Sequence, residues 1–122
     1  MNICSGCLNK EIDVQITIDH SESVHISAVN MEYLRNFVID IVNGSDVDSG
    51  NVRFAVSVYT HEVHNIFHLN TFTTRAEMIN AIQTMPMYSG GTNTTMALAN
   101  LGTVFTNTNG HRTGVPKVYG LL

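Results

Sequence analysis

Short apolar strands alternate with amphipathic helices along this 122-residue chain, and this alternation limits the fold more than any other feature. Residues 13–19 and 52–59 are rich in β-branched residues and predict two strands, of which the second is apolar enough to lie inside a sheet. Between them, from about residue 30 to 42, apolar residues recur at helical spacing. The predicted buried face of that helix consists of Met31, Leu34, Phe37, Val38, Ile41 and Val42.

The second half of the chain continues the pattern. Residues 65–69 predict a short strand, and its brief link to the preceding strand favours a hairpin. Thr74 and Glu77 form a capping box that begins a second helix, and Pro86 ends it. A third helix is expected from about 95 to 105, and its predicted buried residues are Leu98, Leu101, Val104 and Phe105. A further strand begins at about residue 116.

This order of elements predicts an α/β fold. We expect a Rossmann-like, doubly wound and mostly parallel sheet with one antiparallel edge strand and helices on both faces. In such sheets, ligands bind beyond the carboxyl ends of the strands.

Composition and charge exclude several classes of protein. Only 13% of the residues are charged and 43% are hydrophobic, which argues against a disordered chain or a coiled coil. Six basic residues against ten acidic ones give a net charge of −4, so nucleic acid is not an expected partner. The chain contains no apolar run long enough to predict a membrane span.

The first residues carry the only two cysteines, Cys4 and Cys7. A zinc site needs about four ligands, and no second pair of cysteines or histidines has a matching spacing. We therefore favour a local disulfide, or bridges to cysteines outside this chain, over redox catalysis. The segment also lacks the basic and apolar regions of a signal peptide, so the chain is either cytosolic or part of a longer precursor. We treat residues 1–12 as a lead-in and 13–122 as the domain.

Asp19, Ser21 and Ser23 occupy alternate positions directly after the first strand. In an extended turn such residues project to one side, so one carboxylate and two hydroxyls can converge. Oxygen-only ligand sets suit Mg²⁺, Mn²⁺ or Ca²⁺ and suit soft metals poorly. By itself the D-x-S-x-S pattern is a weak signal, because Asp and Ser are common after strands.

The whole pattern resembles the von Willebrand factor type A domain, particularly the copies in collagens and matrix proteins. The matching segments are 13–23, 52–59, 67–72, 88–94 and 114–118, in family order and at family spacing. The resemblance implies a metal-ion-dependent adhesion site whose ligands here are Asp19, Ser21, Ser23 and Thr92. In the family, an acidic residue of a partner protein fills the open coordination position of the metal. The resemblance therefore implies an extracellular module for adhesion or matrix binding, and not an enzyme.

One ligand of the family pattern has no counterpart in this sequence. The family places an aspartate after the strand that begins here at about residue 116, and no aspartate follows Asp48. We therefore expect a C-terminally truncated domain, a weakly held metal ion and a final strand with a bare edge. The alternative function is a structural matrix component, shell- or collagen-associated, that packs without metal; a non-functional fragment is a further alternative.

Other functional motifs are poorly matched. His61, His64 and His68 lack the H-E-x-x-H spacing of a zinc site and are expected to be exposed hairpin residues. The sequence contains no G-x-S-x-G nucleophile motif, and the Gly-rich segment at Gly90 and Gly91 lacks the lysine of a phosphate-binding loop.

Two triplets, at Asn43 and Asn93, are glycosylation sequons if the chain is secreted. Asn93 follows the proposed ligand Thr92 directly, so a glycan there would crowd the binding face. We therefore do not expect the Asn93 sequon to be used.

Overall fold

The computed structural model describes residues 11–20, 28–86, 91 and 94–122. Strands and helices follow one another in the predicted order. The described elements are β1 (Ile12–Asp19), α2 (Ala28–Asn43), β2 (Val52–Tyr59), β3 (Val63–Phe67), α3 (Arg75–Thr84), α4 (Thr94–Asn100) and β4 (Lys117–Leu121).

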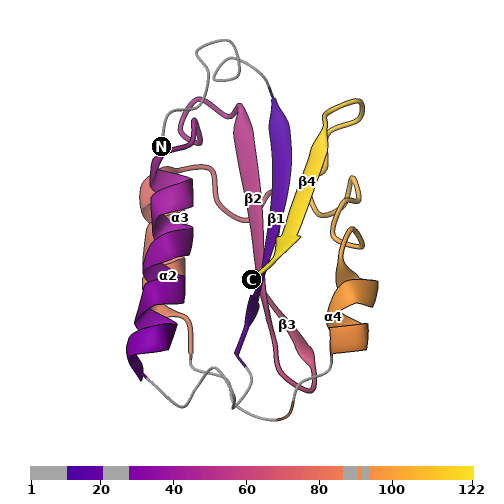
Figure 1. Cartoon of the computed structure of the whole chain (residues 1–122). Helices are drawn as coiled ribbons and strands as arrows, with labels where there is room; N and C mark the ends of the chain where they lie inside the picture. The colour runs from indigo at the N-terminus through magenta and orange to yellow at the C-terminus, as the bar shows by residue number, and fades with distance from the viewer. Residues whose placement is uncertain (1–10, 21–27, 87–90, 92–93) are drawn as a thin grey trace.

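The four described strands form one mixed sheet in the order β3-β2-β1-β4 (Figure 1). Strand β1 is central and pairs in parallel with β2 and with β4, whereas β3 pairs antiparallel with β2. Ile12 lies opposite Val52 and Asp19 lies opposite Tyr59, so β1 and β2 end together. The prediction of a mostly parallel sheet with an antiparallel edge strand is confirmed.

Apolar and polar residues alternate along β1, so the two faces of the sheet differ in character. Ile16 and Ile18 belong to the main core, to which β2 adds Phe54, Val56 and Val58. Helices α2 and α3 lie together on this face (Figure 1). They complete the core with Val38, Val42, Met78 and Ile82, all essentially inaccessible to solvent.

The opposite face of β1 carries Asp13, Gln15 and Thr17, which are polar and fully buried. Helix α4 lies on this side of the sheet (Figure 1), as the prediction of helices on both faces requires. A second, smaller apolar cluster lies on this side of the sheet and consists of Ala55, Leu69, Val104 and Phe105. The backbone N–H of Gly102 donates to the Gln15 side-chain oxygen over 2.9 Å, which satisfies part of this buried polar row.

Three details of the predicted elements are wrong. Strand β3 begins at Val63, two residues earlier than expected. Helix α4 ends at Asn100, because the next residues form tight turns and Gly102 has a left-handed φ of 85°. Leu98 and Phe37, both expected in the core, are 54% and 51% exposed.

Strand β4 is the outermost strand of the sheet among the residues that the structure describes. Val118 and Tyr119 of this strand are each 52% exposed. No described helix combines the length and the apolar character that crossing a membrane requires.

Candidate metal site at the carboxyl edge of the sheet

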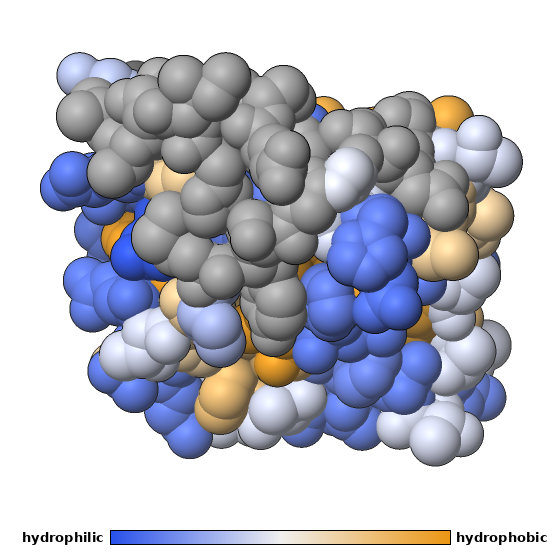
Figure 2. Space-filling view, turned by 90° about the horizontal axis from the view of Figure 1, so that it is seen from below, coloured by the Kyte–Doolittle hydropathy of each residue, from blue (hydrophilic) through white to orange (hydrophobic). Residues whose placement is uncertain are grey.

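Asp19 lies at the centre of the edge where the parallel strands end. It is the last residue of β1, and its backbone N–H donates to the Leu122 carbonyl over 3.0 Å. The next N–H, of His20, donates to the Tyr59 carbonyl over 2.9 Å. The main chain at Asp19 is therefore fixed from both neighbouring strands, and its side chain is half-buried. Figure 2 views the molecule from this end, where hydrophilic residues predominate among those coloured, with a few hydrophobic ones between them.

Tyr59 is a described neighbour of this carboxylate. It lies opposite Asp19 in the register of β1 and β2, and it is 5% exposed. Burial raises the pKa of the Tyr59 phenol, and the negative charge of Asp19 and a hydrogen bond with it raise that pKa further. The phenol therefore remains a neutral donor that orients the carboxylate. The sequence did not predict this role, because it depends on the register that places Tyr59 opposite Asp19.

The other predicted ligands, Ser21, Ser23 and Thr92, lie outside the described residues, as do Cys4, Cys7 and Asn93. Their roles stay predictions. Asp19 is thus the one proposed ligand that the described part of the chain places.

The donor chemistry at Asp19 fits a hard divalent cation. An ionised carboxylate has two oxygens that can accept about four hydrogen bonds or equivalent contacts, so a hydrogen bond such as the one with Tyr59 does not by itself prevent metal binding. Within the described ranges, no group of three or more His, Cys, Asp or Glu side chains could hold a metal. The zinc alternative through His61, His64 and His68 therefore gains no support there; His61 is exposed, and the other two are half-buried.

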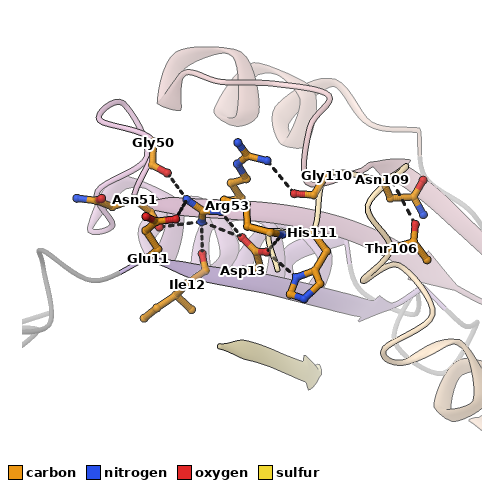
Figure 3. A network of polar contacts seen from close by, with 11 residues as sticks. Glu11, Ile12, Asp13, Gly50, Asn51, Arg53, Thr106, Asn109, Gly110 and His111 are labelled. Atoms are coloured by element: carbon orange, nitrogen blue, oxygen red, sulfur yellow. Dashed lines mark hydrogen bonds and ion pairs between the residues drawn. The ribbon is translucent and has the colours of Figure 1, made fainter. Parts of the chain in front are cut away.

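A second polar group lies at the opposite end of β1 and holds the sheet together (Figure 3). The fully buried Asp13 carboxylate accepts bonds from the Arg112 guanidinium at 2.8 and 3.1 Å and from its backbone N–H at 3.0 Å. His111 Nδ1 lies 2.7 Å from the same carboxylate. Burial alone would raise the pKa of Asp13, but the hydrogen bonds from Arg112 and His111 outweigh it and hold that pKa below its ordinary value.

Arg112 also joins segments that are distant in sequence. Its guanidinium donates to the carbonyls of Ile12, Gly50 and Asn51 and to the exposed carboxylate of Glu11. Nearby, Arg53 donates to the Gly110 carbonyl over 2.8 Å. These bonds fasten the loop before β4 to the starts of β1 and β2. They therefore help to place β4 beside β1, and with it the backbone that fixes Asp19.

The fold and this edge define a class of protein: an α/β domain whose central parallel strand ends in a half-buried aspartate. The family model of the von Willebrand factor type A domain matches residues 13–122. The chain belongs to this family.

Comparison with known proteins gives the same result. The human (Homo sapiens) collagen alpha-6(VI) chain is 34% identical to this chain over an alignment of 122 positions. The alignment covers 95% of this chain and 5% of the collagen chain. Matrilin-1 of Gallus gallus is 32% identical, covering 92% of this chain and 22% of matrilin-1. The chain thus spans a small part of the length of the relatives it matches.

A solved structure shares the fold. It is that of proximal thread matrix protein 1 from the mussel byssus, in which zinc occupies the metal-ion-dependent adhesion site (MIDAS) motif. The TM-score is 0.83 at 22% sequence identity, and the match covers 92% of this chain and 30% of the mussel chain. At that identity the likeness shows the fold alone.

Proposed function

We propose that this chain is an extracellular module for adhesion or matrix binding that recognises an acidic group on a partner through a divalent cation. Asp19, Ser21, Ser23 and Thr92 would hold the cation. The observation that carries the proposal is the half-buried Asp19 carboxylate at the carboxyl edge of the central strand. The relatives include a collagen and a matrilin, which supports a matrix setting, and the mussel protein has a zinc-occupied motif of this kind.

The chain's own residues would place the ligands and contribute one negative charge, that of the Asp19 carboxylate. The backbone bond to Leu122 fixes Asp19, and Tyr59 orients its carboxylate. A bound divalent cation would supply a positive charge that a single protein carboxylate does not neutralise, so it attracts a carboxylate of the partner. Such a site performs recognition and needs no catalytic group.

The expected cation is Mg²⁺, with Mn²⁺ or Ca²⁺ as substitutes, since every proposed ligand is an oxygen atom. One carboxylate and three hydroxyls hold a cation less tightly than a set with a second carboxylate. We therefore expect a dissociation constant of about a millimolar, as in weak extracellular sites. Extracellular matrix or cell-surface proteins would be the partners.

A second candidate function is metal-independent packing in a matrix. The names of the relatives, a collagen and a matrilin, support a matrix setting that does not depend on a bound metal.

Titration calorimetry with Mg²⁺ separates the two functions. We expect the chain to bind Mg²⁺ and to be retained on a carboxylate-bearing surface in Mg²⁺ but not in chelator. Asp19→Asn should weaken Mg²⁺ binding at least about tenfold. Asp40→Asn is the matched control, because Asp40 is an exposed carboxylate on α2. A folded chain that takes up no Mg²⁺, or an Asp19→Asn variant that binds normally, would contradict the adhesion-site proposal and favour the metal-independent one.

A further inference from the structure

We propose that Asn43 carries an N-linked glycan, at the end of the molecule opposite the candidate metal site. This inference rests on the extracellular setting of the proposed function, because N-glycans are added to chains that enter the secretory route. Asn43 begins the sequon Asn43-Gly44-Ser45 and is the last residue of α2, with an exposed side chain.

The local structure turns the sequon so that its asparagine faces solvent while its serine faces inward. Ser45 is 7% exposed, and its hydroxyl donates to the Ile41 carbonyl over 2.6 Å. The Gly44 N–H donates to the Asp40 carbonyl over 2.9 Å. These two bonds satisfy carbonyls of the last helical turn and hold the backbone around Asn43. The triplet is therefore ordered without any use of the Asn43 side chain.

The surroundings of Asn43 leave room for a sugar. The residue lines an open hollow of about 280 Å³ together with Gly44, Ser45, Asp46 and Arg75. A glycan is bulky and hydrophilic and needs such an open, polar position. A first sugar attached at Asn43 would displace no apolar side chain of the core, because the neighbouring core residue, Val42, points inward and is fully buried.

The topology places Asn43 far from Asp19. Helix α2 follows the carboxyl end of β1 in sequence and returns along the sheet to the end where β2 begins (Figure 1). There the Val52 N–H donates to the Asp46 carbonyl, and the Ile12 N–H donates to the Asn51 carbonyl. The eight residues of β1 separate this end from Asp19, a length of about 23 Å at ~3.3 Å per residue.

This separation distinguishes the two sequons. A glycan on Asn43 leaves the carboxyl edge of the sheet open to a partner, whereas Asn93 is adjacent in sequence to the proposed ligand Thr92. The geometry therefore assigns the glycan to Asn43. It also makes the end of the molecule that carries Asn43 a face that a partner does not cover.

Cell-free translation of the full chain behind a secretory leader, with microsomes, tests the assignment without requiring secretion. We expect the translocated chain to gain the mass of one glycan, which endoglycosidase removes. Asn43→Gln should abolish this shift, and Asn93→Gln should leave it intact. Asn43→Gln is the clean variant, because Ser45→Ala would also remove the buried hydrogen bond to Ile41. A wild-type chain with no shift, or a shift that persists undiminished in Asn43→Gln, overturns the proposal.

A second measurement tests the position of the glycan. The glycosylated chain and the same chain after enzymatic deglycosylation should show equal Mg²⁺ affinity and melting temperature, whatever that affinity is. A glycan that lowers either value would contradict the placement of Asn43 at an open and remote end. Failure of Mg²⁺ binding in both forms would instead count against the adhesion site, so the two proposals fail separately.

Discussion

At the scale of single residues, the two carboxylates that bind Arg112 differ in burial and therefore in energetic weight. The Asp13 side chain is fully buried, whereas that of Glu11 is 55% exposed. Asp13→Asn should lower the free energy of unfolding by about 3 kcal/mol, because it leaves the Arg112 charge without its buried partner. Glu11→Gln should cost less than about 1 kcal/mol, as exposed ion pairs do. Urea unfolding of both variants measures the difference, and equal losses would contradict the role given to Asp13.

The lowered pKa of Asp13 also makes stability depend on pH. Because the folded-state pKa lies below the ordinary value of 3.8, the charged carboxylate stabilises the fold fully above pH 3.8. That contribution is lost as the pH falls from 3.8 through the folded-state pKa. The difference in unfolding free energy between wild type and Asp13→Asn should therefore shrink as the pH falls below about 3.8 and through the folded-state pKa of Asp13. A difference that already disappears near neutral pH would show that another group controls it.

Tyr59 offers a spectroscopic test of the carboxyl edge. The phenol should ionise above its ordinary pKa of 10.0, because burial and the Asp19 charge both oppose the phenolate. Asp19→Asn should lower the Tyr59 pKa without restoring the ordinary value, since burial remains. Ultraviolet titration of phenolate, with Tyr59→Phe to identify its signal among four tyrosines, measures this. Unchanged ionisation in Asp19→Asn would mean that the two side chains do not interact.

Residues differ in how far the sequence reveals them. The position of Asp19 at the end of a strand was predictable from the alternating pattern of residues 13–19, whereas its role as a metal ligand stays a prediction. Tyr59 and Arg112 were not predictable, because their roles depend on strand register and on a contact about a hundred residues apart in sequence. Nothing local in the sequence marks Arg112 as the partner of Asp13.

At the scale of elements, burial separates helices that look alike in sequence. Ile82 of α3 is fully buried, whereas Leu98 of α4 is 54% exposed. Ile82→Ala should reduce the free energy of unfolding by about 2–5 kcal/mol, because it leaves a cavity in the main core. Leu98→Ala should cost less than about 1 kcal/mol, because its side chain is already largely in water. Denaturant unfolding checks both values. A large loss of stability in Leu98→Ala would mean that Leu98 is packed in the core and not exposed.

The ends of helices were predictable where local chemistry fixes them. Thr74 caps α3 as expected: its hydroxyl oxygen accepts from the Glu77 N–H over 3.2 Å, and its hydroxyl donates to the Glu77 carboxylate over 2.8 Å. Helix α4 had no such signal at its end. Apolar spacing through Phe105 favoured a longer helix, but the left-handed Gly102 donates to Gln15 and the chain turns there. That bond depends on the sheet, so local periodicity could not predict it.

At the scale of the whole molecule, the alternation of strands with helices along the sequence predicted the topology, because few arrangements bury apolar strands between amphipathic helices. The polar face of β1 could not be predicted in the same way. Gln15 and Thr17 look like exposed positions of a half-buried strand, yet both are fully covered. The placement of Ser21, Ser23 and Thr92, and the division of the chain at residue 12, stay predictions.

The most direct test of the adhesion site is a crystal structure of the chain grown with Mn²⁺, located by its anomalous signal. We predict a peak at about 2.1 Å from an Asp19 oxygen and from the hydroxyls of Ser21, Ser23 and Thr92. A Thr92 hydroxyl more than ~10 Å from those of the two serines would contradict the account, since no single ion can bridge that gap.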